Sequence, residues 1–153
     1  MAHDFKLFPE LTNSQMEVYY FDSPHKQIME DFRAKVVKVI DGDTIRVEVD
    51  FRDFDFPIRF RDIAAPEKDE AGGIRAKEWL ADKILGLEVD ILVNPKVRVG
   101  KWGRLLGSVF AQGVDVGEEM IRRGLSVAWD DRKEGQLPSF ERELENNDFT
   151  QNI

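Results

Sequence analysis

The sequence contains no cysteine among its 153 residues, and its only histidines are His3 and His25. The absence of cysteine excludes disulfides, zinc–thiolate sites and thiol catalysis. Because both histidines lie outside the regularly patterned part of the chain, a histidine-based triad or a multi-histidine metal site is not expected. Chemistry in this chain would therefore depend on carboxylates, arginines and hydroxyl groups.

Long apolar runs are also missing from the sequence. The longest, such as residues 91–93, are far too short to span a bilayer, so no membrane partner is expected. The first residues lack the basic start and apolar stretch of a secretory signal, which makes the cytoplasm the default location. With 42% hydrophobic and 34% charged residues, the composition is that of a globular domain with a substantial core.

Positive charge is scarce, since the chain has a net charge of −8. The acidic excess is concentrated at the ends: residues 1–33 carry −3 and residues 130–153 carry −4, which leaves −1 for residues 34–129. Phosphate binding depends on lysine and arginine, so long-range steering toward nucleic acid should be weak, although the middle can present a local positive cleft. We interpret the acidic ends as solvated flanks. The less favoured alternatives are docking arms for a protein partner of unknown identity, or shields over the cleft.

Hydrophobic periodicity and turn residues predict a mainly β, α+β fold. Two β-branched runs flank the turn-type triplet Asp41-Gly42-Asp43, which is typical of a hairpin. The expected strands cover residues 34–40, 44–49, 56–63, 88–93 and 105–111. The expected helices cover residues 74–85 and a segment from the capping Asp115 to Gly124. One helix after the third strand and another after the fifth indicate a five-stranded Greek-key barrel of the OB type.

The chain is expected to have three parts. Residues 1–33 form an N-terminal extension that packs on or beside the barrel and has one possible strand at 17–21. Residues 34–129 form the barrel domain. Residues 130–153 form an acidic tail with a possible third helix at 139–145.

Three segments carry side chains suited to chemistry, and each has a plain structural alternative. Residues 41–44 supply Asp43, an oxygen ligand for a hard cation, or form only a hairpin turn. Residues 59–67 place arginines and acids in an apolar run, which suits either a site or a solvated strand face. In residues 101–104 a glycine permits a backbone turn and an arginine can reach a phosphate, or the segment is a basic surface turn.

The order and spacing of these segments resemble the staphylococcal nuclease (thermonuclease) family. The resemblance covers residues 34–129 and rests on four motifs: residues 39–45, residues 58–67, residues 101–104 and residues 116–125. It implies an OB-type barrel and a metal-assisted nuclease that cuts DNA and RNA, preferably single-stranded, with little sequence specificity.

The resemblance also implies catalytic roles for individual residues. The two arginines that act on the phosphate fall on Arg59 and Arg104, and the essential glutamate falls on Glu67. Attack of water on a phosphodiester builds negative charge on the phosphate oxygens, which two guanidinium groups can neutralise. The glutamate would position the water or accept its proton.

Metal-binding and substrate-binding positions follow from the same resemblance. Calcium or another divalent cation would be bound by Asp43, by the main chain at Ala65 and by Glu67 through water. Asp41 and Thr44 would lie next to these ligands and hold them in place without binding the metal themselves. The substrate-binding positions are Lys101, Trp102 and Trp129. An aromatic ring stacks on any base, which suits binding without sequence preference.

The sequence departs from the family pattern at Ala64, where an aspartate normally ligates the metal directly. Losing one carboxylate should weaken cation binding. The remaining alternatives are activity with a weakly bound metal, recruitment of Asp69 or Glu70, and a catalytically impaired module that binds nucleic acid or protein.

Overall fold

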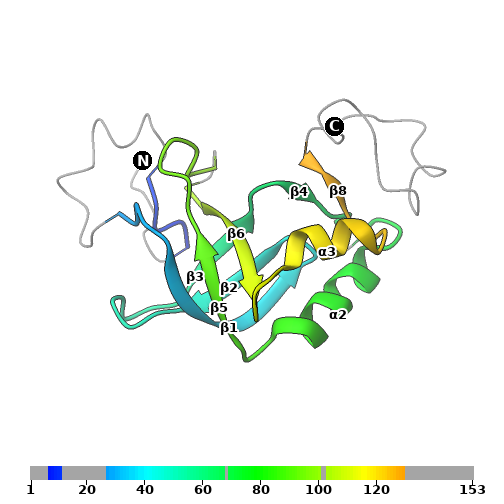
Figure 1. Cartoon of the computed structure of the whole chain (residues 1–153), viewed down its shortest axis with the longest axis horizontal. Helices are drawn as coiled ribbons and strands as arrows, with labels where there is room; N and C mark the ends of the chain where they lie inside the picture. The colour runs from blue at the N-terminus through cyan, green and yellow to red at the C-terminus, as the bar shows by residue number, and fades with distance from the viewer. Residues whose placement is uncertain (1–6, 12–26, 68, 101–102, 130–153) are drawn as a thin grey trace.

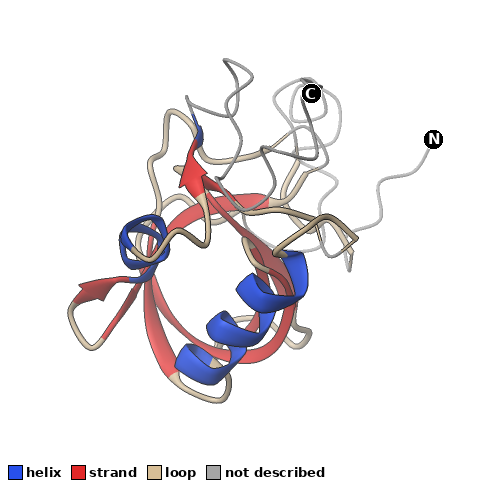
Figure 2. Ribbon diagram, turned by 90° about the vertical axis from the view of Figure 1, so that its right-hand side faces the viewer, coloured by secondary structure: helices blue, strands red, loops and turns tan. Residues whose placement is uncertain are grey.

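Five strands close into a β-barrel in the computed structural model, which describes residues 7–11, 27–67, 69–100 and 103–129 (Figures 1 and 2). The barrel strands are β1 Phe32–Asp41, β2 Thr44–Glu48, β3 Phe56–Phe60, β5 Glu88–Leu92 and β6 Leu105–Ala111. The strand order is β3-β2-β1-β5-β6, and a parallel pairing of β3 with β6 closes the ring. This architecture confirms the predicted OB-type barrel.

Inward-facing residues of the barrel strands form the core. Successive side chains of a strand point to opposite faces, so the apolar positions alternate along β2 and β6. The fully buried members include Val36, Ile45, Ile58, Ile91 and Leu105. Burial of each such side chain stabilises the fold by about 1.5–3 kcal/mol.

The segment expected to be one strand over residues 56–63 is in fact two, and that prediction was wrong. β3 ends at Phe60, and a short strand β4 (Ile63–Ala64) leaves the barrel and pairs with β8 (Val127–Ala128). The intervening turn is stabilised by the Arg59 side chain, which donates hydrogen bonds to the carbonyls of Phe60 and Ile63 at 2.5 and 2.9 Å. A further short strand, β7 (Val114–Asp115), pairs with β6.

Two helices lie toward the same end of the barrel (Figures 1 and 2). α2 (Gly73–Ile84) buries Ala76, Leu80 and Ile84 at the four-residue spacing that the sequence predicted. Trp79 packs against the core. α3 (Val116–Arg122) begins where Asp115 accepts a hydrogen bond from the Glu118 backbone at 3.1 Å, as its predicted capping role requires.

The described part of the N-terminal segment, residues 7–11, lies at the opposite end of the barrel from the helices (Figure 1). Leu11 and Glu10 are fully buried there. The interpretation of the acidic N-terminal flank as solvated is therefore wrong for Glu10. The possible elements at 17–21 and 139–145, and the tail 130–153, lie outside the described residues. None of the helices formed by the described residues is long and apolar enough to cross a membrane.

Candidate active site

The turn between β1 and β2 buries the Asp43 carboxylate. Asp41 and Thr44 are register partners, so the hairpin turns through Gly42 and Asp43. The Asp43 backbone N–H donates to the Asp41 carboxylate at 3.1 Å, and the Thr44 hydroxyl donates to Asp43 at 3.2 Å. Asp43 is only 5% exposed, so its carboxylate is directed into the protein rather than into solvent.

Gly42 lets this turn approach its neighbours closely. A Cβ at this position would lie 2.7 Å from the Ala65 Cβ and 2.9 Å from the Ala76 Cβ. From the sequence, Gly42 was explained by the conformation of a hairpin turn. In the structure a glycine is needed here for lack of space, because α2 and the segment after β4 pack directly against the turn. No local signal in the sequence distinguishes the two requirements.

The Asp43 carboxylate links the turn to two other predicted site residues. Its Oδ2 atom accepts a hydrogen bond from the Ala65 backbone N–H at 2.9 Å and lies 3.4 Å from the Arg59 guanidinium. The structure therefore brings Asp43, Arg59 and Ala65 together. The register of β2 with β3, in which Thr44 faces Arg59, explains why the turn and the arginine meet.

Asp41 and Glu67 add negative charge at the same place. Burial, the neighbouring Asp43 charge and, least, the Glu67 charge together raise the pKa of Asp41 to about 7. Glu67 itself is exposed, and its backbone N–H donates to the Glu70 carboxylate at 2.6 Å. Three of the predicted acidic residues thus lie near enough to influence one another electrostatically.

Trp129 covers the Arg59 side chain. The guanidinium carbon lies 5.3 Å from the centre of the Trp129 ring, a cation–π arrangement, and the tryptophan is 43% exposed. The tryptophan is positioned by β8, which pairs with β4, and by its backbone N–H, which donates to the Asp62 carbonyl at 2.8 Å. An aromatic face therefore borders the arginine at the surface.

Arg104 lies on the same side of the barrel as Arg59. Arg59 is the register partner of Leu106 in the parallel β3–β6 pair, and side chains two residues apart on a strand share a face. Arg104 is half-buried and forms no ion pair with any described residue. Lys101 and Trp102, the other residues predicted in this segment, lie outside the described residues.

Two carboxylates, those of Asp41 and Asp43, lie at the β1–β2 turn. Carboxylate oxygens are the ligands that calcium prefers. Burial first, and the neighbouring Asp43 charge second, raise the pKa of Asp41. Ala64 is 2% exposed and supplies no carboxylate. Within the described ranges, no three His, Cys, Asp or Glu side chains form a group that could hold a metal ion, and Asp69 and Glu70 join none.

Several known proteins resemble this chain over much of its length. A family model described as "Staphylococcal nuclease homologue" matches residues 57–147, more than half of the chain. A "Micrococcal nuclease" of Shigella flexneri is 35% identical over 108 residues, which cover 65% of this chain and 59% of that protein. "Protein ParB" of Escherichia coli is 38% identical over 110 residues, covering 65% of this chain and 58% of that protein.

A third relative is more distant. An "Uncharacterized endonuclease" of Haemophilus influenzae is 30% identical over 96 residues, covering 63% of this chain and 52% of that protein. The matches thus span between 52% and 59% of the length of these three relatives.

Proposed function

The chain belongs to the staphylococcal nuclease homologue family, and from this premise we propose that it is a nuclease that hydrolyses phosphodiester bonds of DNA and RNA with little sequence specificity. The observation that carries the proposal is the meeting of Arg59, Asp43 and Trp129 at one end of β3, with Arg104 on the same face. This places positive charge, carboxylate oxygens and an exposed aromatic ring around one surface.

Arg59 and Arg104 are the groups proposed to act on the scissile phosphate. Attack by water adds negative charge to the phosphate oxygens, and guanidinium forks stabilise that charge bidentately. Arg59 is held in place by two backbone carbonyls and by Asp43, so little reorganisation is needed when charge develops. Arg104 has no ionic partner among the described residues, which leaves its guanidinium available to a phosphate.

Glu67 is the proposed base. Its carboxylate is exposed and lies within electrostatic reach of Asp41, so it is accessible to the attacking water. It would take the proton of the water or orient the water toward phosphorus.

Divalent-metal dependence, with calcium as the first candidate, is part of the proposal. Asp43, the Ala65 main chain and Glu67 through water would hold the cation, with Asp41 and Thr44 supporting Asp43 through hydrogen bonds. Such an ion supplies positive charge to the phosphate and lowers the pKa of bound water. Because Ala64 contributes no side-chain carboxylate, we expect weak affinity.

The substrate is proposed to be single-stranded or frayed nucleic acid. Trp129 can stack on an unpaired base, and base–aromatic stacking contributes about 1–3 kcal/mol per base without sequence preference. Lys101 and Trp102 remain sequence-based predictions for contacts with the same strand.

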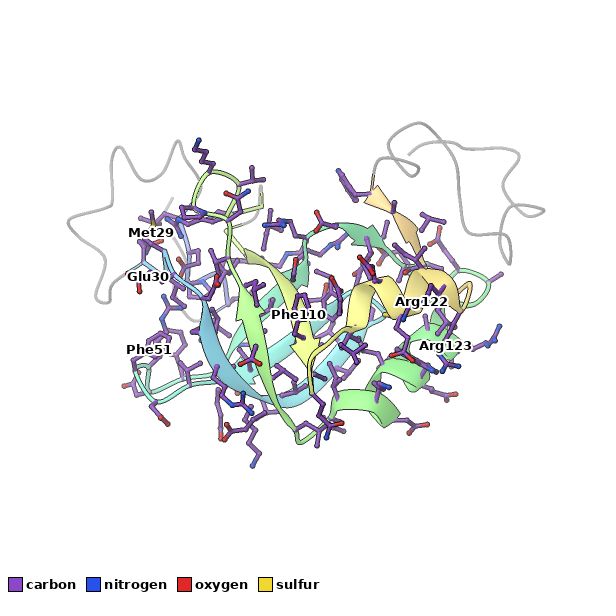
Figure 3. All side chains as sticks on the ribbon, viewed as in Figure 1. Met29, Glu30, Phe51, Phe110, Arg122 and Arg123 are labelled. Atoms are coloured by element: carbon purple, nitrogen blue, oxygen red, sulfur yellow. The ribbon has the colours of Figure 1, made fainter. Side chains whose placement is uncertain are left out.

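The test is cleavage of single-stranded DNA and RNA across a calcium titration, with a chelator control. Glu67→Gln should abolish metal-dependent cutting, whereas Glu30→Gln, at an exposed position, should leave it unchanged (Figure 3). Ala64→Asp should lower the calcium concentration needed for half-maximal activity, because it restores an anionic oxygen.

The competing function, a catalytically impaired binding module, predicts another result. In that case neither the unmodified protein nor Ala64→Asp cuts at millimolar calcium, while single-stranded DNA still binds. If only Ala64→Asp cuts, the site is intact except for the carboxylate ligand that is missing at position 64.

A further inference from the structure

A buried ion triad anchors residues 7–11 to the barrel. The Glu10 carboxylate is fully buried and accepts hydrogen bonds from Arg98 at 2.6 Å and from Arg52 at 2.5 Å, one on each oxygen. Arg52 lies in the β2–β3 connection and Arg98 in the β5–β6 connection. Removing one member of such a triad leaves an uncompensated buried charge, so its geometry is strongly enforced.

Glu10 also holds the β5–β6 connection through its main chain. Its backbone N–H donates to the carbonyl of Gly103 at 3.1 Å, and Gly103 directly precedes Arg104. The N-terminal segment and this connection lie side by side at the end of the barrel away from the helices (Figure 1).

Ile28 forms a second contact between the N-terminal part of the chain and the β5–β6 connection. The Ile28 backbone N–H donates to Glu10 at 2.9 Å, and the Ile28 carbonyl accepts from Arg98 at 3.2 Å. Two separate N-terminal stretches therefore converge on Arg98.

The internal bonds of the β5–β6 connection transmit this anchoring to Arg104. The carbonyl of Arg98 accepts from the Leu106 N–H at 2.8 Å, and the carbonyl of Arg104 accepts from the Gly100 N–H at 2.9 Å. Val99 and Leu105 form an isolated antiparallel bridge between these bonds. Arg98 and Arg104 thus lie on the two sides of one small hairpin. Glu10 contacts one side through its carboxylate and the other through its backbone N–H.

We propose that Glu10 is a positioning residue that sets the orientation of Arg104 toward the phosphate. The inference rests on the proposed nuclease function. Glu10 lies outside residues 57–147, which the family model matches. The contact with the Arg104 hairpin is therefore made by a part of the chain that the family model does not cover. Buried ion triads add little net stability compared with apolar packing. A role in fixing a single geometry of the hairpin accounts for charged residues at this position.

The decisive experiment is a double-mutant cycle on the full chain. Glu10→Gln should lower kcat/KM on single-stranded DNA on the order of tenfold, because small misplacements of a charge-stabilising group are costly. In an Arg104→Ala background the same substitution should change kcat/KM less than twofold. Equal losses in the two backgrounds would show that Glu10 acts only on stability and would overturn the proposal.

A second readout follows the hairpin itself. Hydrogen exchange of peptides covering residues 96–106 should quicken in Glu10→Gln, while exchange in α2 and α3 should match the unmodified protein. Glu30→Gln is the matched control, an exposed acid at the same end of the molecule (Figure 3). Unchanged exchange at residues 96–106 would also overturn the proposal.

Two further arms keep the test decisive. If Glu10→Gln loses its near-ultraviolet circular dichroism, Arg98→Lys weakens the same contact from the hairpin side while keeping the charge, and the same cycle applies. If the unmodified protein does not cut, the cycle is repeated on single-stranded DNA binding by fluorescence anisotropy. Coupling between Glu10 and Arg104 in binding then supports the positioning role while the proposed cleavage fails, and additive effects overturn it.

Discussion

The Arg59 guanidinium lies 3.4 Å from the Asp43 carboxylate and stacks 5.3 Å from the centre of the Trp129 ring. One side chain therefore joins the β1–β2 turn to the segment after β8. The same side chain bridges the turn after β3 through the Ile63 carbonyl. Its position is determined by contacts that Lys cannot reproduce, because the ammonium group lacks a planar fork.

Arg59→Lys should lower kcat/KM for single-stranded DNA by roughly 10²–10³-fold, the usual cost of losing a charge-stabilising donor. Arg61→Lys is the matched control, since Arg61 pairs with the exposed Asp62 at 3.3 Å instead of with the site. Similar losses in both variants would remove Arg59 from its proposed role.

Gly42→Ala should destabilise the protein by about 1–3 kcal/mol through overpacking, because the new methyl group would overlap the Cβ atoms of Ala65 and Ala76. Gly100→Ala is the control, since a methyl group there would have its nearest neighbouring atom at 3.5 Å. Thermal unfolding of the two variants checks this, and a Gly42→Ala protein as stable as the unmodified one would contradict the close approach.

Asp41→Asn should stabilise the metal-free protein at alkaline pH. The folded-state pKa of about 7 lies above the ordinary value of 3.8, so the folded state binds the proton more tightly and loses stability as pH rises through this window. Asparagine is neutral throughout, so the melting temperature of the variant should exceed that of the unmodified protein by a few degrees at pH 8.5 and match it near pH 4. Chelator is present in all samples. Asp69→Asn, at an exposed position, should show no such trend.

Glu119→Gln should destabilise the protein near neutral pH but not in acid. The Glu119 carboxylate pairs with Lys83 at 3.2 Å and with Arg123 at 3.1 Å, and the interaction with Lys83 is the main reason that its pKa is lowered. A lowered pKa contributes stability above the ordinary value of 4.5 that disappears as pH falls through the folded value.

Melting curves of Glu119→Gln from pH 7 to pH 3 should therefore converge on those of the unmodified protein. The control is Glu118→Gln on the same helix, whose carboxylate is 71% exposed and lies 3.6 Å from Arg122. Arg122 is the last residue of α3 and Arg123 follows it as the helix C-cap (Figure 3). The Arg123 guanidinium lies over the Trp79 ring of α2 at 5.6 Å. A constant difference across the pH range would show that the Glu119 charge is not what stabilises this contact.

Local elements of the fold were predictable from the sequence because their signals are local. The Asp41-Gly42-Asp43 turn, the alternation along β6 and the four-residue spacing in α2 each lie within a few consecutive residues. The capping role of Asp115 depends only on the three residues that follow it. The order of the strands and helices then indicated the barrel.

Contacts between distant residues were not predictable in the same way. Glu10 resembled one more acid of a solvated flank, yet its arginine partners lie 42 and 88 positions further along the chain. The break after β3 was missed because β4 pairs with β8, more than sixty residues away in the sequence. Neither pairing leaves a periodic trace in the amino acids around it.

The order of amino acids was enough to predict most strands, both helices and the barrel they form, because periodicity and turn chemistry are properties of neighbouring positions. The candidate residues Arg59, Glu67 and Arg104 followed instead from the resemblance to the staphylococcal nuclease family, and their roles remain predictions. Three features emerged only from the folded chain: Asp43 is bound by Arg59 and Ala65, Gly42 is needed for close packing, and Glu10 anchors the hairpin of Arg104. Burial and ion pairing depend on which segments meet once the barrel closes.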